Sequence, residues 1–141
     1  MAFPFLEDNL KSTRRMEALA QGLSDEDLLR LTPDGWTVAA LFAHMAFWDR
    51  RVLVLTRRWK EKGFDESPID ADAVNDALKP LFLALDPHTA VQLALSAAKA
   101  TDAELVTLTS EMLERIQAGS THFRPNRALH RGGHMAQIEA A

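Results

Sequence analysis

The chain has no cysteine among its 141 residues. This absence excludes disulfide bonds, thiolate ligands to a metal and a protein thiol acting as a nucleophile. Any thiol chemistry would therefore require a low-molecular-weight thiol from outside the chain, and any metal ligands would have to be residues of other types.

Long apolar runs and a strong excess of positive charge are also missing. No window approaches the roughly 18 apolar residues of a membrane-spanning helix, and the N-terminal residues lack the apolar stretch of a signal peptide. The formal net charge is −4, and the basic residues alternate with apolar ones at helical spacing, which is typical of a solvated helix face. We therefore expect a cytoplasmic protein that has neither a membrane nor a nucleic acid as partner.

Glycine and proline are scarce, with 6 of each, while 47% of the residues are hydrophobic. The long polar or low-complexity tracts that would indicate disorder do not occur. A folded chain of this length buries roughly 70% of the surface that its unfolded form exposes. We expect residues 1–141 to form a single domain with a real core.

Apolar residues recur every three or four positions, which predicts helices along most of the chain. The strongest pattern extends from Thr37 to about Lys62, carries Trp48 and Trp59 on its apolar stripe, and ends at Gly63. No strand pattern is found, so the sequence predicts an all-α four-helix bundle with short extra helical segments. The other predicted helices cover residues 5–22, 71–85 with a kink or break at Pro80, 87–108, a short segment at 111–119, and the stretch from Pro125 onward.

Three histidines are candidate ligands for one divalent metal ion. His130 and His134 lie four residues apart on the last predicted helix, so both side chains can reach one metal at about 2.0 to 2.1 Å. His44 lies at the edge of the apolar stripe of its helix and should face the bundle or its mouth. Taken singly, the pair can arise by chance and His44 can be an ordinary core residue, but together they predict a metal site.

Gly132 and Gly133 lie between the paired histidines, although each costs about 1 kcal/mol relative to Ala inside a helix. Either the missing side chains let a ligand or a neighbouring helix approach the backbone, or the helix is frayed or kinked there. One face of this helix is also unusually polar for a surface that faces into a bundle, which suits a wet pocket. The polar residues of that face are Asn126, His130, His134 and Gln137.

Two segments, residues 35–51 and 126–138, resemble one known family. Their resembling residues are Gly35-Trp36-Thr37-Val38, Leu41 to His44, Ala46 to Arg51, and Asn126 to Ile138. The pattern resembles the DinB-like metal-binding four-helix bundles, which include damage-inducible proteins, predicted metal-dependent hydrolases and thiol-dependent transferases. The resemblance implies that His44, His130 and His134 ligate the metal. Arg131 stands where the zinc peptidase motif HExxH has its glutamate, so a peptidase is not expected.

The resemblance and the ligand set imply a metal-dependent enzyme acting on a small molecule. Zn and Ni are the favoured metals, and Fe and Co also suit imidazole ligands. Open coordination positions fit a hydrolase or a transferase that uses a low-molecular-weight thiol. A binding or sequestering module without turnover and a structural bundle without metal are the alternatives, and a homodimer is considered as the assembly state.

Four polar residues near the predicted site are candidates for binding the substrate. Two of them are arginines, which could hold an anionic group of the substrate. The alternative for each arginine is a surface position with the aliphatic part of the side chain lying over the apolar stripe. The four residues are Arg51, Arg127, Asn126 and Gln137.

Overall fold

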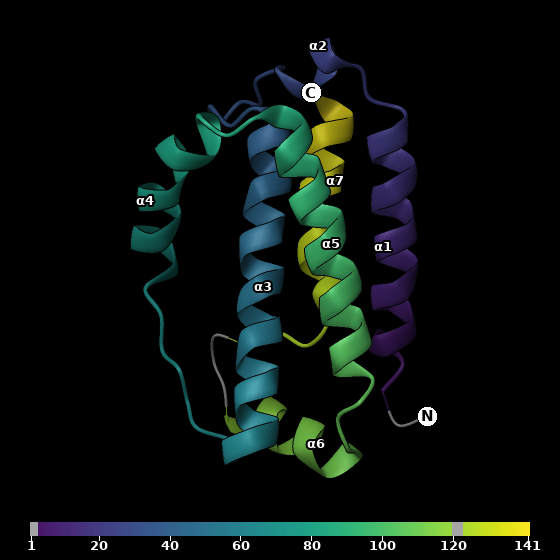
Figure 1. Ribbon diagram of the computed structural model, residues 1–141, viewed down its shortest axis with the longest axis vertical. Coiled ribbons are helices and arrows are strands. Elements are labelled where there is room, and N and C mark those ends of the chain that lie inside the picture. Colours follow the sequence, from purple (N-terminus) through teal and green to yellow (C-terminus); the bar gives the residue numbers. More distant parts are fainter. Residues whose placement is uncertain (1–2, 120–122) are drawn as a thin grey trace.

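The computed structural model describes residues 3–119 and 123–141. Over these two ranges the chain forms seven helices and no strand, and one isolated β-bridge joins Leu31 to Thr37. The prediction of an all-α fold is confirmed. The helices, shown in Figure 1, are α1 (Phe5–Gln21), α2 (Asp25–Leu28), α3 (Val38–Lys62), α4 (Ala71–Leu83), α5 (Pro87–Leu105), α6 (Ser110–Gly119) and α7 (Arg127–Ala140).

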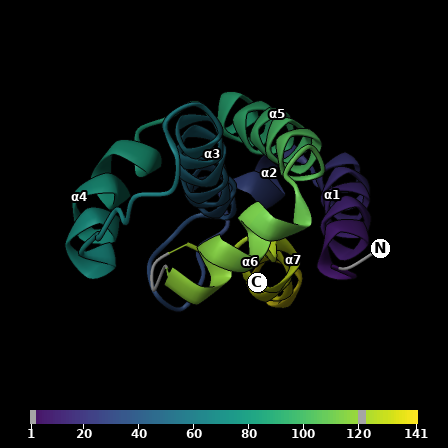
Figure 2. The same cartoon turned by 90° about the horizontal axis from the view of Figure 1, so that it is seen from below.

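Helices α1, α3, α5 and α7 form a four-helix bundle. Helix α3 packs against α5, α5 against α1, α1 against α7 and α7 against α3, which closes the ring seen end-on in Figure 2. Helix α6 lies across one end of the bundle, at the bottom of Figure 1. Helix α4 lies outside the bundle beside α3 and has no buried residue. None of the helices in the described ranges is long and apolar enough to cross a membrane.

Helix α3 is the central element of the fold, and its ends agree with the predicted ones. The Thr37 side chain accepts a hydrogen bond from the backbone N–H of Ala40, which satisfies one of the free donors of the first turn. Gly63 ends the helix with a φ of 88°, a conformation that residues with a Cβ atom rarely adopt. The stripe itself differs from the prediction at one position. Trp59 is buried in the core with 1% exposure, whereas Trp48 is only half-buried and donates from Nε1 to Asn75 Oδ1 on α4 at 2.9 Å.

The predicted break at Pro80 does not occur, because α4 continues to Leu83. A proline removes one intrahelical hydrogen bond, and here it lies in the last turn, where little of the helix depends on that bond. Asp70 begins the helix by accepting from the backbone N–H of Ala73 at 3.1 Å.

The start of α7 is held by a side chain from α1. Asn9 donates from Nδ2 to the carbonyl of Pro125 at 2.8 Å, and its Oδ1 accepts from the backbone N–H groups of Arg127 and Ala128 at 2.8 and 3.0 Å. These N–H groups have no partner within their own helix. Asn126, the residue before α7, makes no capping bond with its side chain. A buried residue of α1 therefore fixes where α7 begins, one turn before His130.

A buried network of charged side chains ties α7 to α3 and α5. Asp49 on α3 accepts from Arg127 Nε at 2.8 Å and from Arg131 Nε at 2.9 Å, and all three side chains are at most 5% exposed. Arg131 also pairs through Nη2 with Asp102 on α5 at 2.9 Å, and its Nη1 donates to the Thr13 hydroxyl on α1 at 3.1 Å. Because buried charges are tolerated only when paired, this network sets the position of α7 against the other three helices.

Candidate metal centre

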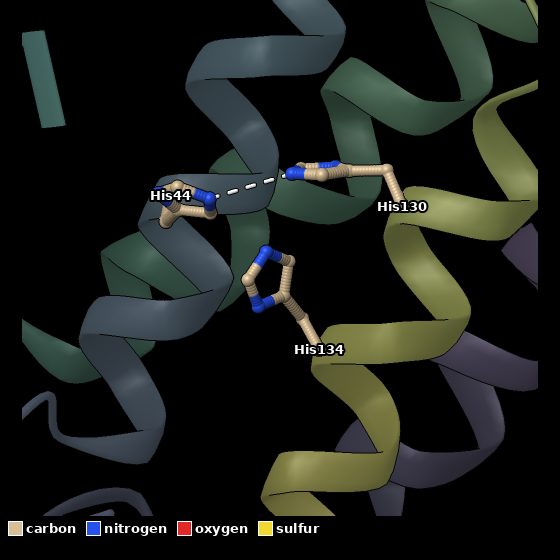
Figure 3. A group of neighbouring side chains, drawn as sticks. All are labelled: His44, His130 and His134. Atoms are coloured by element: carbon tan, nitrogen blue, oxygen red, sulfur yellow. Dashed lines mark hydrogen bonds between the residues drawn. The ribbon is translucent and has the colours of Figure 1, made fainter. Parts of the chain in front are cut away.

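Three histidine rings converge where α3 and α7 face each other. His44 projects from α3, and His130 and His134 project from successive turns of α7, as Figure 3 shows. One nitrogen from each ring belongs to a set of atoms that all lie within 4.8 Å of one another. The Nε2 atoms of His44 and His130 are 3.3 Å apart. Across the described part of the chain this is the one cluster of side chains that could hold a metal ion.

The three rings are held by packing as well as by their helices. His44 is 7% exposed, and the Trp36 ring packs edge-on against it with a centroid distance of 5.4 Å. The His134 ring lies 4.5 Å from that of His44 and 4.6 Å from that of His130, again edge to face. Rings restrained in this way lose little freedom on binding a shared ion.

The Nδ1 atoms of the three rings have different surroundings. His134 Nδ1 lies 2.7 Å from Gln137 Oε1, so it is the protonated nitrogen and leaves the Nε2 lone pair free for a ligand role. His130 Nδ1 lies 3.2 Å from Arg127 Nη2. His44 Nδ1 is buried and has no hydrogen-bond partner in the described structure. Three converging imidazole nitrogens without a carboxylate among them form a ligand set that could hold a divalent metal ion.

All three histidines are neutral at neutral pH. Burial lowers the pKa of His44 to about 4, with a further decrease from His134 and Arg127. Burial, followed by the charge of Arg127, lowers the pKa of His130 to about 2. Burial also lowers the pKa of His134, although its hydrogen bond to Gln137 opposes this change. The neutral imidazole is the form that binds metals, so the ligands need not lose a proton at neutral pH.

We expect the metal-free protein to lose stability as the pH falls below the unperturbed histidine pKa of 6.5. The folded-state pKa values of His44 and His130 are lowered, so the unfolded chain binds protons first, and acid shifts the equilibrium toward it. Each such histidine costs about 1.4 kcal/mol per pH unit between the unfolded and the folded pKa. Urea denaturation at about pH 7 and about pH 5 measures the loss, and a His130→Gln variant should show a smaller one. An equal loss of stability in this variant would contradict the lowered pKa of His130 in the folded protein.

A cavity of about 1000 Å³ lies beside the histidines. Its walls are α3 and α7, together with α4, the loop before α3, and the residues before α7. Aromatic rings of Trp36 and Trp48 contribute apolar surface, and Lys79 and Arg124 contribute positive charge. A small molecule with a partly apolar body could occupy this space next to the three rings.

Three of the four predicted substrate-binding residues line this cavity, namely Asn126, Arg127 and Gln137. Arg51 is not part of the lining, because its Nη2 donates to the Ser67 carbonyl at 2.6 Å and its guanidinium lies 6.0 Å from the centre of the Trp48 ring. Gln137 and Arg127 each bond a histidine ring. Contact of any of the four with a substrate remains a prediction.

The two glycines of α7 do not serve a close approach of the backbone to other protein groups. A Cβ atom at Gly132 would meet only Arg15 Nη1 at 3.9 Å, and one at Gly133 would meet nothing within 4 Å. Nor is α7 interrupted there, because it runs unbroken from Arg127 to Ala140. Among the described protein atoms there is neither a close approach of a neighbouring helix nor a frayed segment at the two glycines, and the approach of a ligand stays a prediction.

Replacing Gly133 by Ala should therefore stabilise the protein by about 0.5 to 1 kcal/mol, since the position is helical and exposed and the change lowers the entropy of the unfolded chain. Gly63→Ala is the matched comparison, because a φ of 88° strains any residue with a Cβ atom, and it should destabilise. Urea midpoints of the two variants would test this expectation, and a destabilised Gly133→Ala variant would show that the position has a role that the protein atoms do not reveal.

A comparison with protein families gives one result. A family model described as the DinB superfamily matches residues 10–140, a span that includes all three histidines. No curated protein and no solved structure matches the chain.

Proposed function

Since the chain belongs to the DinB superfamily, we propose that it is a metal-dependent enzyme that adds a nucleophile, either water or an external low-molecular-weight thiol, to a small molecule. The observation that carries this proposal is the convergence of three neutral imidazoles at the wall of a cavity of about 1000 Å³. Zn and Ni suit such a ligand set best, and Fe and Co also suit it.

When bound, the metal would activate water toward its deprotonated form or hold a thiol as thiolate. The side chains of the protein would orient the ligands and bind the substrate. The His134 proton on Nδ1 stays with Gln137, which keeps Nε2 turned toward the other two rings. Trp36 and Trp48 would offer apolar surface to the body of the substrate, and Asn126 would offer a polar side chain in the cavity wall.

The general base of zinc peptidases has no equivalent on α7. Arg131 occupies the corresponding position and is 0% exposed. It donates to Asp49 and to residues of α1, and it is ion-paired with Asp102. The acidic residues that line the cavity are Asp34, in the loop before α3, and Asp76 on α4, and neither belongs to the histidine cluster. This arrangement favours small-molecule chemistry over peptide hydrolysis.

Two assays on tag-free protein loaded with zinc or nickel test the proposal. One follows hydrolysis of an activated ester, and the other follows conjugation of glutathione or cysteine to a chlorodinitrobenzene. We expect turnover in one assay, its loss in His44→Ala, and its retention in His88→Ala, because His88 is an exposed histidine outside the cluster. A metal-loaded protein that turns over in neither assay would contradict the enzyme and favour a binding module.

A further inference from the structure

The residue before α7 does not perform the structural role that its position usually has. Asparagine is among the preferred residues there, because its side-chain oxygen accepts from the free backbone N–H groups of the first turn. Asn126 makes no such bond. Asn9 on α1 takes this role instead, since its Oδ1 accepts from the backbone N–H groups of Arg127 and Ala128. The carboxamide of Asn126 is therefore not needed to begin the helix.

This carboxamide also has an unpaired acceptor. Asn126 Oδ1 is buried and has no hydrogen-bond partner among the described residues. An unpaired buried acceptor lowers stability, and native proteins contain few of them. Because no bond to Oδ1 fixes the carboxamide, and the last torsion of an asparagine side chain is broad, the oxygen can turn toward a donor. The atom calls for an N–H or O–H group that the described residues do not supply.

Asn126 lies close to where a bound molecule would be held. It lines the cavity of about 1000 Å³ together with His130 and His134. It also precedes His130 by four residues, which is about one helical turn. A small molecule that occupies the cavity beside the three rings could therefore offer a donor to this side chain.

Two other carboxamides in the cavity wall already have partners. The Gln137 oxygen lies 2.7 Å from the Nδ1 atom of a histidine ring. Asn75 Oδ1 accepts from Trp48 Nε1 at 2.9 Å. Both groups thus hold parts of the protein in place, whereas the oxygen of Asn126 is left for a ligand.

We propose that Asn126 is a specificity-determining residue whose carboxamide oxygen accepts a hydrogen bond from the substrate. The substrate class is a small molecule with a neutral N–H or O–H donor, such as an amide or an alcohol, near the group that meets the metal. A cationic donor is disfavoured, because Lys79 and Arg124 line the same cavity and the metal would add further positive charge. This inference rests on the proposed function and names its substrate class.

The first test asks whether the fold needs Asn126, and it uses the metal-free protein. Asn126→Leu should keep or raise the urea midpoint, because it removes an unpaired buried acceptor. Asn9→Leu is the comparison and should lower the midpoint, since it removes three hydrogen bonds at the start of α7. A clear fall of the midpoint in Asn126→Leu would overturn the proposal in favour of a structural role.

The second test offers the zinc-loaded protein two probes that chelate zinc and differ in one donor. Acetohydroxamate carries an N–H group beside its zinc-binding oxygens, and N-methylacetohydroxamate has a methyl group on that nitrogen. Calorimetry gives the Kd of each probe. The preference for acetohydroxamate should be about tenfold larger in the wild type than in Asn126→Leu, as expected for one buried hydrogen bond. Equal preferences would overturn the proposal, because the donor would then have another partner, such as water.

Two further variants separate the acceptor from the shape of the side chain. Asn126→Asp keeps an accepting oxygen and should keep the wild-type preference. Asn75→Leu makes the matched change in the same cavity wall, at a carboxamide whose oxygen is already bonded, and should also keep it. Loss of the preference in either variant would overturn the acceptor role of Asn126.

Failure of this inference can be told apart from failure of the proposed function. A wild type that binds no zinc would remove the proposed function. Zinc binding together with equal probe preferences in the wild type and Asn126→Leu would remove only the role of Asn126.

Discussion

Replacing Asp49 by Ala is expected to lower the free energy of unfolding by about 3 to 5 kcal/mol, the usual cost of removing one partner of a buried ion pair. Asp49 is 0% exposed and its two oxygens accept from Arg127 and Arg131. Without it, Arg131 keeps only Asp102 as an ion-pair partner, Arg127 loses its carboxylate, and the ion pairs between α3 and α7 are lost.

Urea denaturation followed by circular dichroism measures this effect. Glu139→Ala is the matched control, because Glu139 also lies on a bundle helix in an ion pair, with Arg15, but both side chains are about half exposed. Its loss should cost less than about 1 kcal/mol. Similar midpoints for Asp49→Ala and Glu139→Ala would show that the buried network does not hold the bundle together.

Much of the bundle could be predicted from the spacing of apolar residues. The ends of α3 are marked by Thr37 and Gly63, whose chemistry is local, so the sequence suffices to place them. Which helices form the bundle, in contrast, is not determined by the local sequence. Helix α4 carries apolar residues at helical spacing, including Leu78 and Leu81, and yet it has no buried residue. Whether a helix joins the bundle depends on which helix faces pack against one another in the folded chain.

The candidate site was also predictable only in part, because local spacing determines some of its features and three-dimensional packing determines the others. The spacing of His130 and His134 places them on one face of α7, and the match to the DinB superfamily includes His44 in the same span. The roles of the arginines were not predictable, because a surface anchor and a buried ion pair have the same sequence signature. One signal was available: Asp49 follows Met45 by four residues and precedes Val52 by three, so it belongs to the buried stripe of α3. A carboxylate there requires a buried cation as partner.

Replacing His130 or His134 by Ala should abolish stoichiometric metal binding while the helical fold persists. Helix α7 keeps its own anchors, since Met135 and Ile138 are buried in the core and Arg131 stays ion-paired. In the wild type, a metal at a hundredfold excess over its Kd adds about 2.7 kcal/mol to the stability of the folded state. We expect this metal-dependent increase in the melting temperature to disappear in both variants.

Thermal denaturation with and without added zinc or nickel measures the increase, and His88→Ala should retain it, because this histidine lies outside the cluster. A His134→Ala variant that keeps the full increase would remove His134 from the site. Loss of helical circular dichroism in the metal-free variants would instead show that the histidines are needed for the fold.

The most direct measurement of the central claim is the metal content of the tag-free protein after incubation with zinc or nickel and removal of excess metal. The account predicts one metal ion per chain in the wild type and in His88→Ala, and none in His44→Ala, His130→Ala or His134→Ala, since all three rings contribute to one cluster. A wild-type protein that retains no metal, or variants that retain as much as the wild type, would contradict it.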